Sequence, residues 1–189
     1  MKFPESKLAH KYLDGLKGIE IGGSAHNPFG LDTINVDYTD AITPYKEEEL
    51  ALCRTMLKVD VVSLGDNLPF PNKSYDFVIS SHVIEHFFDP IKAIKEWERV
   101  ARKYIYIIAP HMDRMFDADK IPTKPDELWD RYNGKIINET PEDHSHYSYW
   151  RTADFVNLIE TIGLKIKEVQ DRDDKVGNGF AVLISLEND

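Results

Sequence analysis

The order of the apolar segments is the strongest constraint on the fold. Short runs rich in Ile, Val and Phe alternate along the chain with longer polar or amphipathic stretches. Strands are expected at 18–22, 33–37, 59–62, 75–79 and 104–109, and helices at 89–101 and 152–163. Alternation of this kind predicts an α/β fold with a parallel sheet and right-handed crossovers.

The end of the chain departs from the alternation. Two final apolar segments, 164–169 and 180–186, flank a turn-rich stretch of Asp, Asn and Gly. Strand-like segments on either side of a short turn predict an antiparallel hairpin. We therefore expect a mostly parallel sheet that closes with an antiparallel C-terminal hairpin.

Residues 111–149 also interrupt the pattern. The segment is rich in Asp, Pro, His and aromatic residues, and only 125–132 has helical character. A long irregular insertion in a compact domain is usually a lid or a binding loop, and the aromatic residues argue against disorder. We expect 1–189 to form a single domain with a lid-like insertion at about 111–149.

Two strand ends carry the residue types of a nucleoside site. Gly22 and Gly23 follow the first strand, and Asp37 ends the second. Ligands of open α/β sheets bind outside the carboxyl ends of the strands, where glycines permit close approach and an acid accepts ribose hydroxyls. The Gly-x-Gly-x-x-Gly fingerprint of dinucleotide-binding proteins is missing here, which disfavours a nicotinamide or flavin cofactor.

A longer motif is more specific. Residues 68–86 read LPFPNKSYDFVISSHVIEH, and Asp89-Pro90 and the helical EWERV of 96–100 follow. This pattern resembles the class I S-adenosylmethionine (SAM)-dependent methyltransferases, particularly those related to ubiquinone and small-molecule methyltransferases. The resemblance covers about 18–110 and the closing helix and hairpin. It implies a Rossmann-like sheet, S-adenosyl-L-methionine as cofactor, and methyltransferase activity.

The resemblance also implies the cofactor-binding residues. They comprise the first acid and the turn after it, the ribose-binding acid, the chain beside the adenine, and a residue beside the sulfonium. In this order they are Glu20, Gly22, Gly23 and Ser24; Asp37; Ser63, Leu64 and Gly65; and Ser81.

The chain departs from the family pattern in three places that concern the cofactor. Ser24 and His26 stand at the second and third glycine positions of the usual Gly-x-Gly-x-Gly turn. Residues 24–32 are too few for a full crossover helix between two parallel strands. Leu64 stands where the family often has an acid. These departures leave open an alternative, a SAM-binding interaction module without turnover.

Histidines are the candidates for catalysis. A hydroxyl acceptor gains from a general base, and histidine serves this role most often. His82, His146 and His111 are expected near the mouth of the pocket, and we predict them as catalytic residues, with His144 as a further candidate. For each of them alone, a hydrogen-bonded loop histidine is an equally good interpretation.

The spacing of His82, Glu85 and His86 allows a different interpretation. Residues at i, i+3 and i+4 share one face of a helix, and with His144 or His146 they would offer a ligand set for a divalent metal. Because Glu-His after the fourth strand commonly serves as scaffolding in the resembled family, we expect no metal site.

Composition bears on the partners. The formal net charge of −10 disfavours a nucleic acid acceptor, so an RNA methyltransferase is the weakest alternative. A lone cysteine and the lack of a long apolar run predict a cytoplasmic protein without membrane association. The expected acceptor is a small molecule or a glycan, methylated at a hydroxyl. Nothing in the sequence indicates an oligomeric state.

Overall fold

The computed structural model describes residues 5–23, 29–139 and 146–187. One sheet of seven strands forms its centre, in the order β3-β2-β1-β4-β5-β7-β6. β1 to β5 run parallel, whereas β7 runs antiparallel to both of its neighbours. The strands are β1 (Lys17–Ile21), β2 (Asp32–Asp37), β3 (Val61–Val62), β4 (Tyr75–Ser81), β5 (Ala101–Pro110), β6 (Lys165–Asp171) and β7 (Gly179–Ser185).

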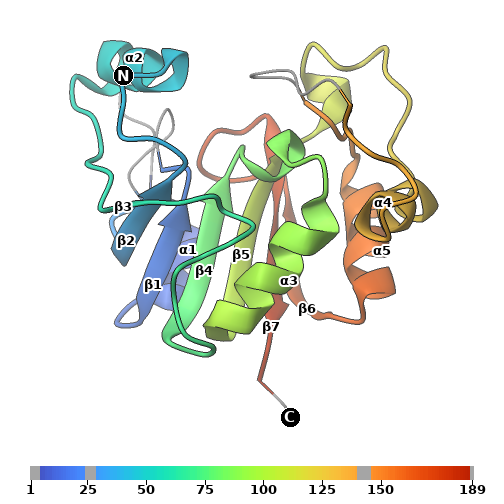
Figure 1. Ribbon diagram of the computed structural model, residues 1–189. Coiled ribbons are helices and arrows are strands. Elements are labelled where there is room, and N and C mark those ends of the chain that lie inside the picture. The colour runs from blue at the N-terminus through green and yellow to red at the C-terminus, as the bar shows by residue number, and fades with distance from the viewer. Residues whose placement is uncertain (1–4, 24–28, 140–145, 188–189) are drawn as a thin grey trace.

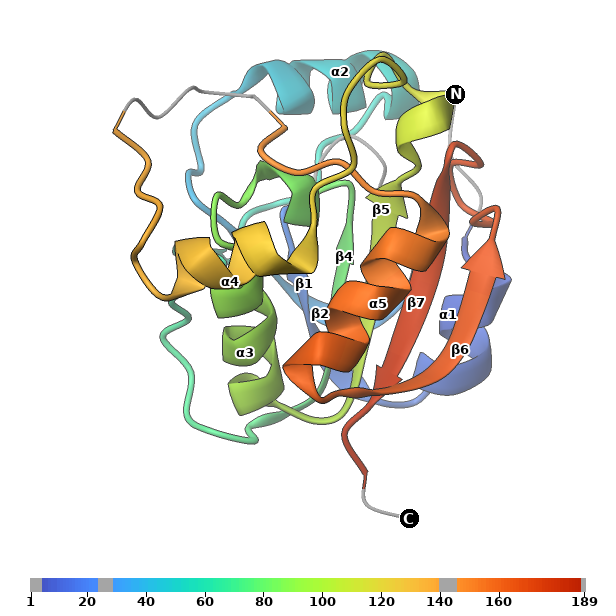
Figure 2. The ribbon, with the colours of Figure 1, turned by 90° about the vertical axis from the view of Figure 1, so that its right-hand side faces the viewer.

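Helices cover both faces of the sheet (Figures 1 and 2). α3 and α5 lie on one face, where Trp97 and Phe155 pack in the larger apolar cluster. α1 covers the other face and buries Leu8 and Leu13 against Phe77. The helices are α1 (Lys7–Leu13), α2 (Pro44–Cys53), α3 (Pro90–Val100), α4 (Pro125–Tyr132) and α5 (Thr152–Ile162).

This topology confirms the predicted fold class, a mostly parallel Rossmann-like sheet with an antiparallel C-terminal hairpin. α3 begins as its sequence predicts: the Asp89 side chain accepts the N–H of Lys92, and Pro90 occupies the first turn. α5 ends at Gly163, whose φ of 86° closes the helix. The described residues between β1 and β2 form no helix, in agreement with the short connection.

α1 and α2 were not predicted from the sequence. α1 has only seven residues, too few to show a clear period, and Ser6 caps it by accepting the N–H of Ala9. The buried positions of α2 are Lys46 and Glu49, which are charged rather than apolar. An apolar period therefore does not mark α2, although Thr43 and Pro44 form an ordinary helix start. No described helix is both long and apolar enough to cross a bilayer.

Asp173 organises the turn that joins β6 to β7. Its carboxylate is buried and accepts backbone N–H groups from Lys175, Val176, Gly177 and Gly179. Burial alone would raise the pKa of Asp173, but these N–H groups outweigh it and hold the pKa below its usual value. The ionised carboxylate is thus part of the folded turn.

Replacing Asp173 by alanine should lower the free energy of unfolding by about 2–4 kcal/mol, since charge-assisted bonds are lost and their donors are left unpaired. A carboxyl whose pKa is lowered on folding contributes stability above its unfolded pKa and loses it as pH falls. Wild type should therefore lose more stability than Asp173→Asn on going from pH 7 to below about pH 4. Urea unfolding across this range measures both effects. Asp40→Ala, at an exposed site, is the control, and equal acid sensitivity of wild type and Asp173→Asn would refute the role.

Candidate active site at the carboxyl edge of the sheet

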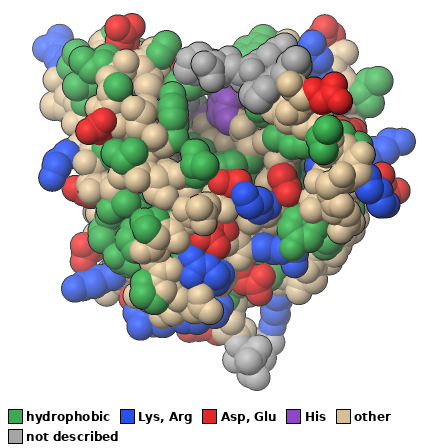
Figure 3. All heavy atoms as spheres, in the orientation of Figure 1, with side chains coloured by type: hydrophobic (Ala, Val, Ile, Leu, Met, Phe, Trp, Pro, Cys, Tyr) green, Lys and Arg blue, Asp and Glu red, His purple; other side chains and the backbone are tan. Residues whose placement is uncertain are grey.

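The carboxyl ends of the parallel strands meet at one edge of the sheet. Figure 1 shows α2 to one side of this edge and the segment after β5 to the other. The surface is hollowed between them, with a histidine side chain in the hollow (Figure 3). Because β7 runs antiparallel to β5, the β6–β7 turn reaches the same edge. The described strand ends and the β6–β7 turn therefore meet where ligands of α/β sheets bind.

The turn after β1 requires glycine at its first position. Gly22 has a φ of 64°, and a Cβ there would lie 2.8 Å from a methyl carbon of Val83. Gly23 is fixed by Asn35 of β2, whose Oδ1 accepts its N–H at 3.1 Å and whose Nδ2 donates to its carbonyl. The backbone of this turn is thus held at the edge of the sheet in a conformation that lets a ligand approach it closely.

Asp37 lies at the end of β2 and is only 8% exposed. Burial raises the pKa of its carboxyl, although Lys46 of α2 acts in the opposite direction. The Nζ of Lys46 is 4.0 Å from Asp37 Oδ2 and donates to the carbonyl of Thr39. A buried acid at this strand end suits the ribose hydroxyls of a nucleoside.

Glu20 is buried beside Asn35 in the β1–β2 register. Its Oε2 accepts the hydroxyl of Thr33 at 3.4 Å. Lys175, in the β6–β7 turn, interacts electrostatically with Glu20, but burial dominates and lowers the lysine pKa to about 8. Glu20 therefore has structural partners in addition to the cofactor role that the resemblance implies.

The residues of the loop after β3, which the resemblance places beside the adenine, have surroundings of their own in the fold. The Leu64 side chain is 60% exposed, and Ser63 Oγ donates to the carbonyl of Asn67 at 2.9 Å. The carbonyl of Gly65 accepts the indole N–H of Trp97 at 2.8 Å, and a Cβ at Gly65 would strike Ile21 and Phe87. Packing accounts for this glycine. Ser24, another expected cofactor residue, lies outside the described residues.

Ser81 ends β4 at the centre of the edge, and His82 follows it. Within the described part of the chain, Ser81 Oγ is buried without a hydrogen-bond partner. His82 has a φ of 55°, and its Nε2 is 2.8 Å from Asn178 Oδ1. The amide nitrogen of Asn178 donates to the sulfur of Met115, which can only accept. Asn178 Oδ1 is therefore the acceptor, so Nε2 of His82 carries the proton and Nδ1 carries the lone pair.

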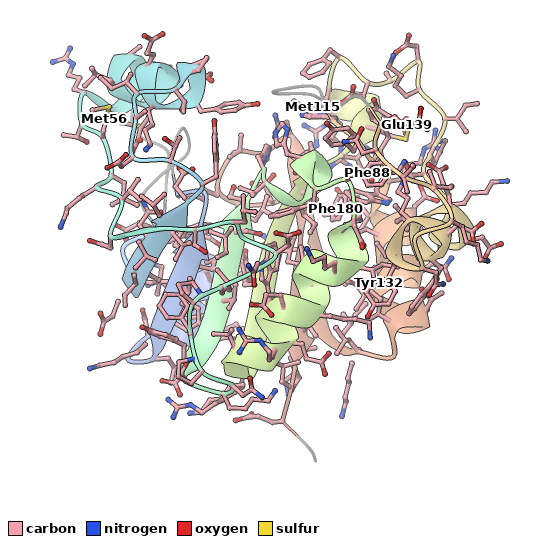
Figure 4. All side chains as sticks on the ribbon, viewed as in Figure 1. Met56, Phe88, Met115, Tyr132, Glu139 and Phe180 are labelled. Atoms are coloured by element: carbon pink, nitrogen blue, oxygen red, sulfur yellow. The ribbon has the colours of Figure 1, made fainter. Side chains whose placement is uncertain are left out.

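His111 meets the same asparagine through its backbone. Its N–H donates to the carbonyl of Asn178 at 3.2 Å, and its ring contacts the edge of Phe180. Figure 4 shows Met115 above Phe180 at this end of the sheet. Burial, and then the charge of Arg114, lower the pKa of His111 and favour its neutral form. Asn178 thus joins two of the predicted catalytic histidines.

His146, the third, lies in a separate group. Its Nδ1 is 2.7 Å from the Oδ2 of Asp117, and its ring centroid is 4.8 Å from that of His86. The carbonyl of Glu85 accepts the N–H of Tyr147, which ties this segment to the turn after β4. His144 lies outside the described residues.

The turn after β4 does not form the expected helix face. The 3₁₀ helix spans Ile84–His86, and His82 precedes it in a left-handed conformation. His82 therefore does not share a helix face with Glu85 and His86. Glu85 is 1% exposed, and burial raises the pKa of its carboxyl to about 8.

Sequence reasoning missed three residues of this site: Asn35, Asp117 and Asn178. Each acts by orienting another residue, so neither spacing nor residue type marks it. The β6–β7 turn was recognised only as a turn, and its position at the ligand edge follows from the antiparallel β7 strand.

Known proteins agree with this architecture. A methyltransferase-domain family model matches residues 23–108. A Thermotoga maritima SAM-dependent methyltransferase, described as a possible histamine N-methyltransferase, has 16% identity and a TM-score of 0.60, with 95% of this chain and 86% of that one covered. A SAM-dependent methyltransferase of Aquifex aeolicus has 15% identity and a TM-score of 0.52 over 97% and 95% of the two chains.

A relative in sequence is an uncharacterized protein of Methanocaldococcus jannaschii. It is 27% identical over 202 residues, which cover 97% of this chain and 87% of the relative. At these identities the structural matches describe the fold, and the family model, which begins at Gly23, covers the motif around Ser81 and His82. Residues 23–108 therefore match the methyltransferase-domain family, and the described chain shares the fold of SAM-dependent methyltransferases.

Proposed function

We propose that this methyltransferase transfers the methyl group of SAM to a hydroxyl of a small molecule or glycan, with His82 as the general base. The observation that carries the proposal is the position of His82, which directly follows Ser81 at the end of β4 and whose ring is oriented through Nε2 by Asn178 Oδ1. A base oriented in this way takes a hydroxyl proton as the oxygen becomes methylated. The formal charge of −10 supports a small acceptor over a nucleic acid.

The residues at the edge fit SAM. Gly22 and Gly23 would lie against its methionine part, Asp37 would accept the ribose hydroxyls, and Ser81 would lie beside the sulfur. SAM supplies a methyl group on a positively charged sulfur. The protein positions the acceptor in line with that group, an effect that can supply about 7–11 kcal/mol of the barrier lowering.

The segment 111–149 would cover the acceptor, within one domain that spans 1–189. Its ends are fixed to the body: His111 donates its N–H to the carbonyl of Asn178, and Tyr147 donates its N–H to the carbonyl of Glu85. Its aromatic rings include Phe116, 76% exposed and 5.2 Å from the ring of His146, and Tyr147, which packs on Phe88 (Figure 4 labels Phe88). An exposed ring such as that of Phe116 suits the face of a sugar or of a flat ring.

Calorimetry and a turnover screen test the proposal. Purified protein should bind SAM and its demethylated product, and it should methylate members of a library of small hydroxylated compounds, oligosaccharides and amines. Amines are included because of the description of the Thermotoga protein. Binding without turnover on every acceptor would favour the interaction module, and preferential methylation of RNA would overturn the choice of acceptor.

A further inference from the structure

Glu85, His86 and His146 form a cluster that the base mechanism does not use. Each residue offers one possible metal-ligand atom, and these three atoms lie within 4.8 Å of one another. Glu85 Oε1 is 3.8 Å from His86 Nε2. The group joins the turn after β4 to the far end of the segment after β5. From these contacts we infer that Glu85, His86 and His146 bind a divalent transition metal ion of the zinc type, a site that was not expected from the sequence.

The carboxylate of Glu85 is the first reason. Glu85 is 1% exposed, and its Oε2 has no hydrogen-bond partner among the described residues. Burying a carboxylate oxygen without a donor or a cation is costly, so an unsatisfied oxygen in a native fold calls for a partner. A metal ion between Glu85 and the two imidazoles would satisfy it.

The tautomer of His146 is the second reason. Asp117, itself 3% exposed, accepts from Nδ1 of His146 at 2.7 Å. With its proton on Nδ1, His146 presents the lone pair of Nε2 to a ligand. Metal-binding histidines commonly donate their other nitrogen to a carboxylate in this way, which fixes the ring and raises its basicity.

The ligand types and their spacing suit zinc. Two imidazoles and one carboxylate form a usual set for catalytic Zn²⁺, which keeps a further position open. Ligands at about 2.0–2.2 Å from a tetrahedral ion lie about 3.3–3.6 Å from one another, so the observed separations need only small side-chain rotations. Imidazole nitrogens suit Zn²⁺, whereas Mg²⁺ prefers oxygen ligands.

The surroundings place the cluster beside the proposed acceptor site. The ring of His86 meets Tyr45 of α2 at a centroid distance of 5.7 Å, and the ring of His146 meets Phe116. An open coordination position there would take an oxygen of the acceptor. This role rests on the proposed function, whereas metal binding itself does not.

The test is zinc binding by metal-free protein without an affinity tag, measured by calorimetry and by the visible spectrum of a Co²⁺ substitute. We expect one Zn²⁺ per chain and weak or no binding of Mg²⁺. Glu85→Gln and His146→Ala should each weaken Zn²⁺ binding by at least about 100-fold, and Asp117→Asn by about 10–100-fold. His10→Ala is the matched control, because His10 also lies beside two carboxylates, those of Glu5 and Asp14. This variant should bind Zn²⁺ as wild type does, since His10 lies outside the cluster.

Circular dichroism melts of each variant separate loss of the site from loss of the fold. If His146→Ala does not fold, the nearly isosteric Glu85→Gln and Asp117→Asn variants decide the question. SAM binding is measured on the same samples, so a failure of the methyltransferase proposal is seen separately. Wild type that binds no stoichiometric Zn²⁺, or Glu85→Gln and Asp117→Asn that bind it as wild type does, would overturn the inference.

Discussion

Replacement of His82 by asparagine is expected to lower kcat by about 10²–10⁴-fold, the usual contribution of a general base. Asparagine is chosen because it tolerates the left-handed φ of 55° at this position better than alanine does. The side chain loses the imidazole lone pair but leaves the end of β4 in place. SAM affinity should change little, since the backbone N–H of His82 still donates to the carbonyl of Ile108. Single-turnover kinetics and calorimetry measure the two quantities.

The partner of His82 gives a more specific test. Wild-type turnover should fall toward acid pH, because a protonated imidazole has no lone pair to accept the acceptor's proton. Asn178→Asp would place a carboxylate on Nε2, favour the imidazolium and move this fall to higher pH. His10→Ala, a histidine that bonds Asp14 and the carbonyl of Phe29 and not Asn178, should keep the wild-type profile. Full turnover by His82→Asn, or an unchanged pH profile for Asn178→Asp, would exclude His82 as the base.

The fold could be predicted because its signals are local. β4 and β5 are apolar runs, α3 starts with Asp89-Pro90, and the last two strands flank a turn. Each of these features depends on residues close together in the sequence. The motif around Ser81 and His82 indicated the resemblance to SAM-dependent methyltransferases, and this resemblance predicted which edge of the sheet holds the ligand.

The orienting residues could not be predicted because they act across long stretches of chain. Asn178 meets His82 from 96 positions away, and Asp117 meets His146 from 29 positions away. Their hydrogen bonds exist only after β7 has paired with β5 and the segment after β5 has folded back. The packing role of Gly65 was missed for the same reason, since its neighbours Ile21 and Phe87 come from other elements.

Gly22→Ala is expected to weaken SAM binding by about 10–100-fold. Alanine is strained at a φ of 64°, and its Cβ would lie 2.8 Å from a methyl carbon of Val83. Strain of this kind is typically about 1–3 kcal/mol, and each 1.4 kcal/mol corresponds to a tenfold change in affinity. Relief of the contact moves the turn or the start of the loop after β4, and both belong to the proposed SAM site. Calorimetry with SAM measures the loss.

Gly15→Ala separates the contact from the backbone effect. Gly15 has a similar φ of 74°, but a Cβ there meets nothing within 4 Å. This variant should therefore lose some stability through its backbone conformation and still bind SAM as wild type does. Gly22→Ala combined with Val83→Ala should recover part of the affinity, because the shorter side chain removes the collision and leaves only the strained φ. If Gly22→Ala binds SAM with wild-type affinity, the turn after β1 does not hold the cofactor.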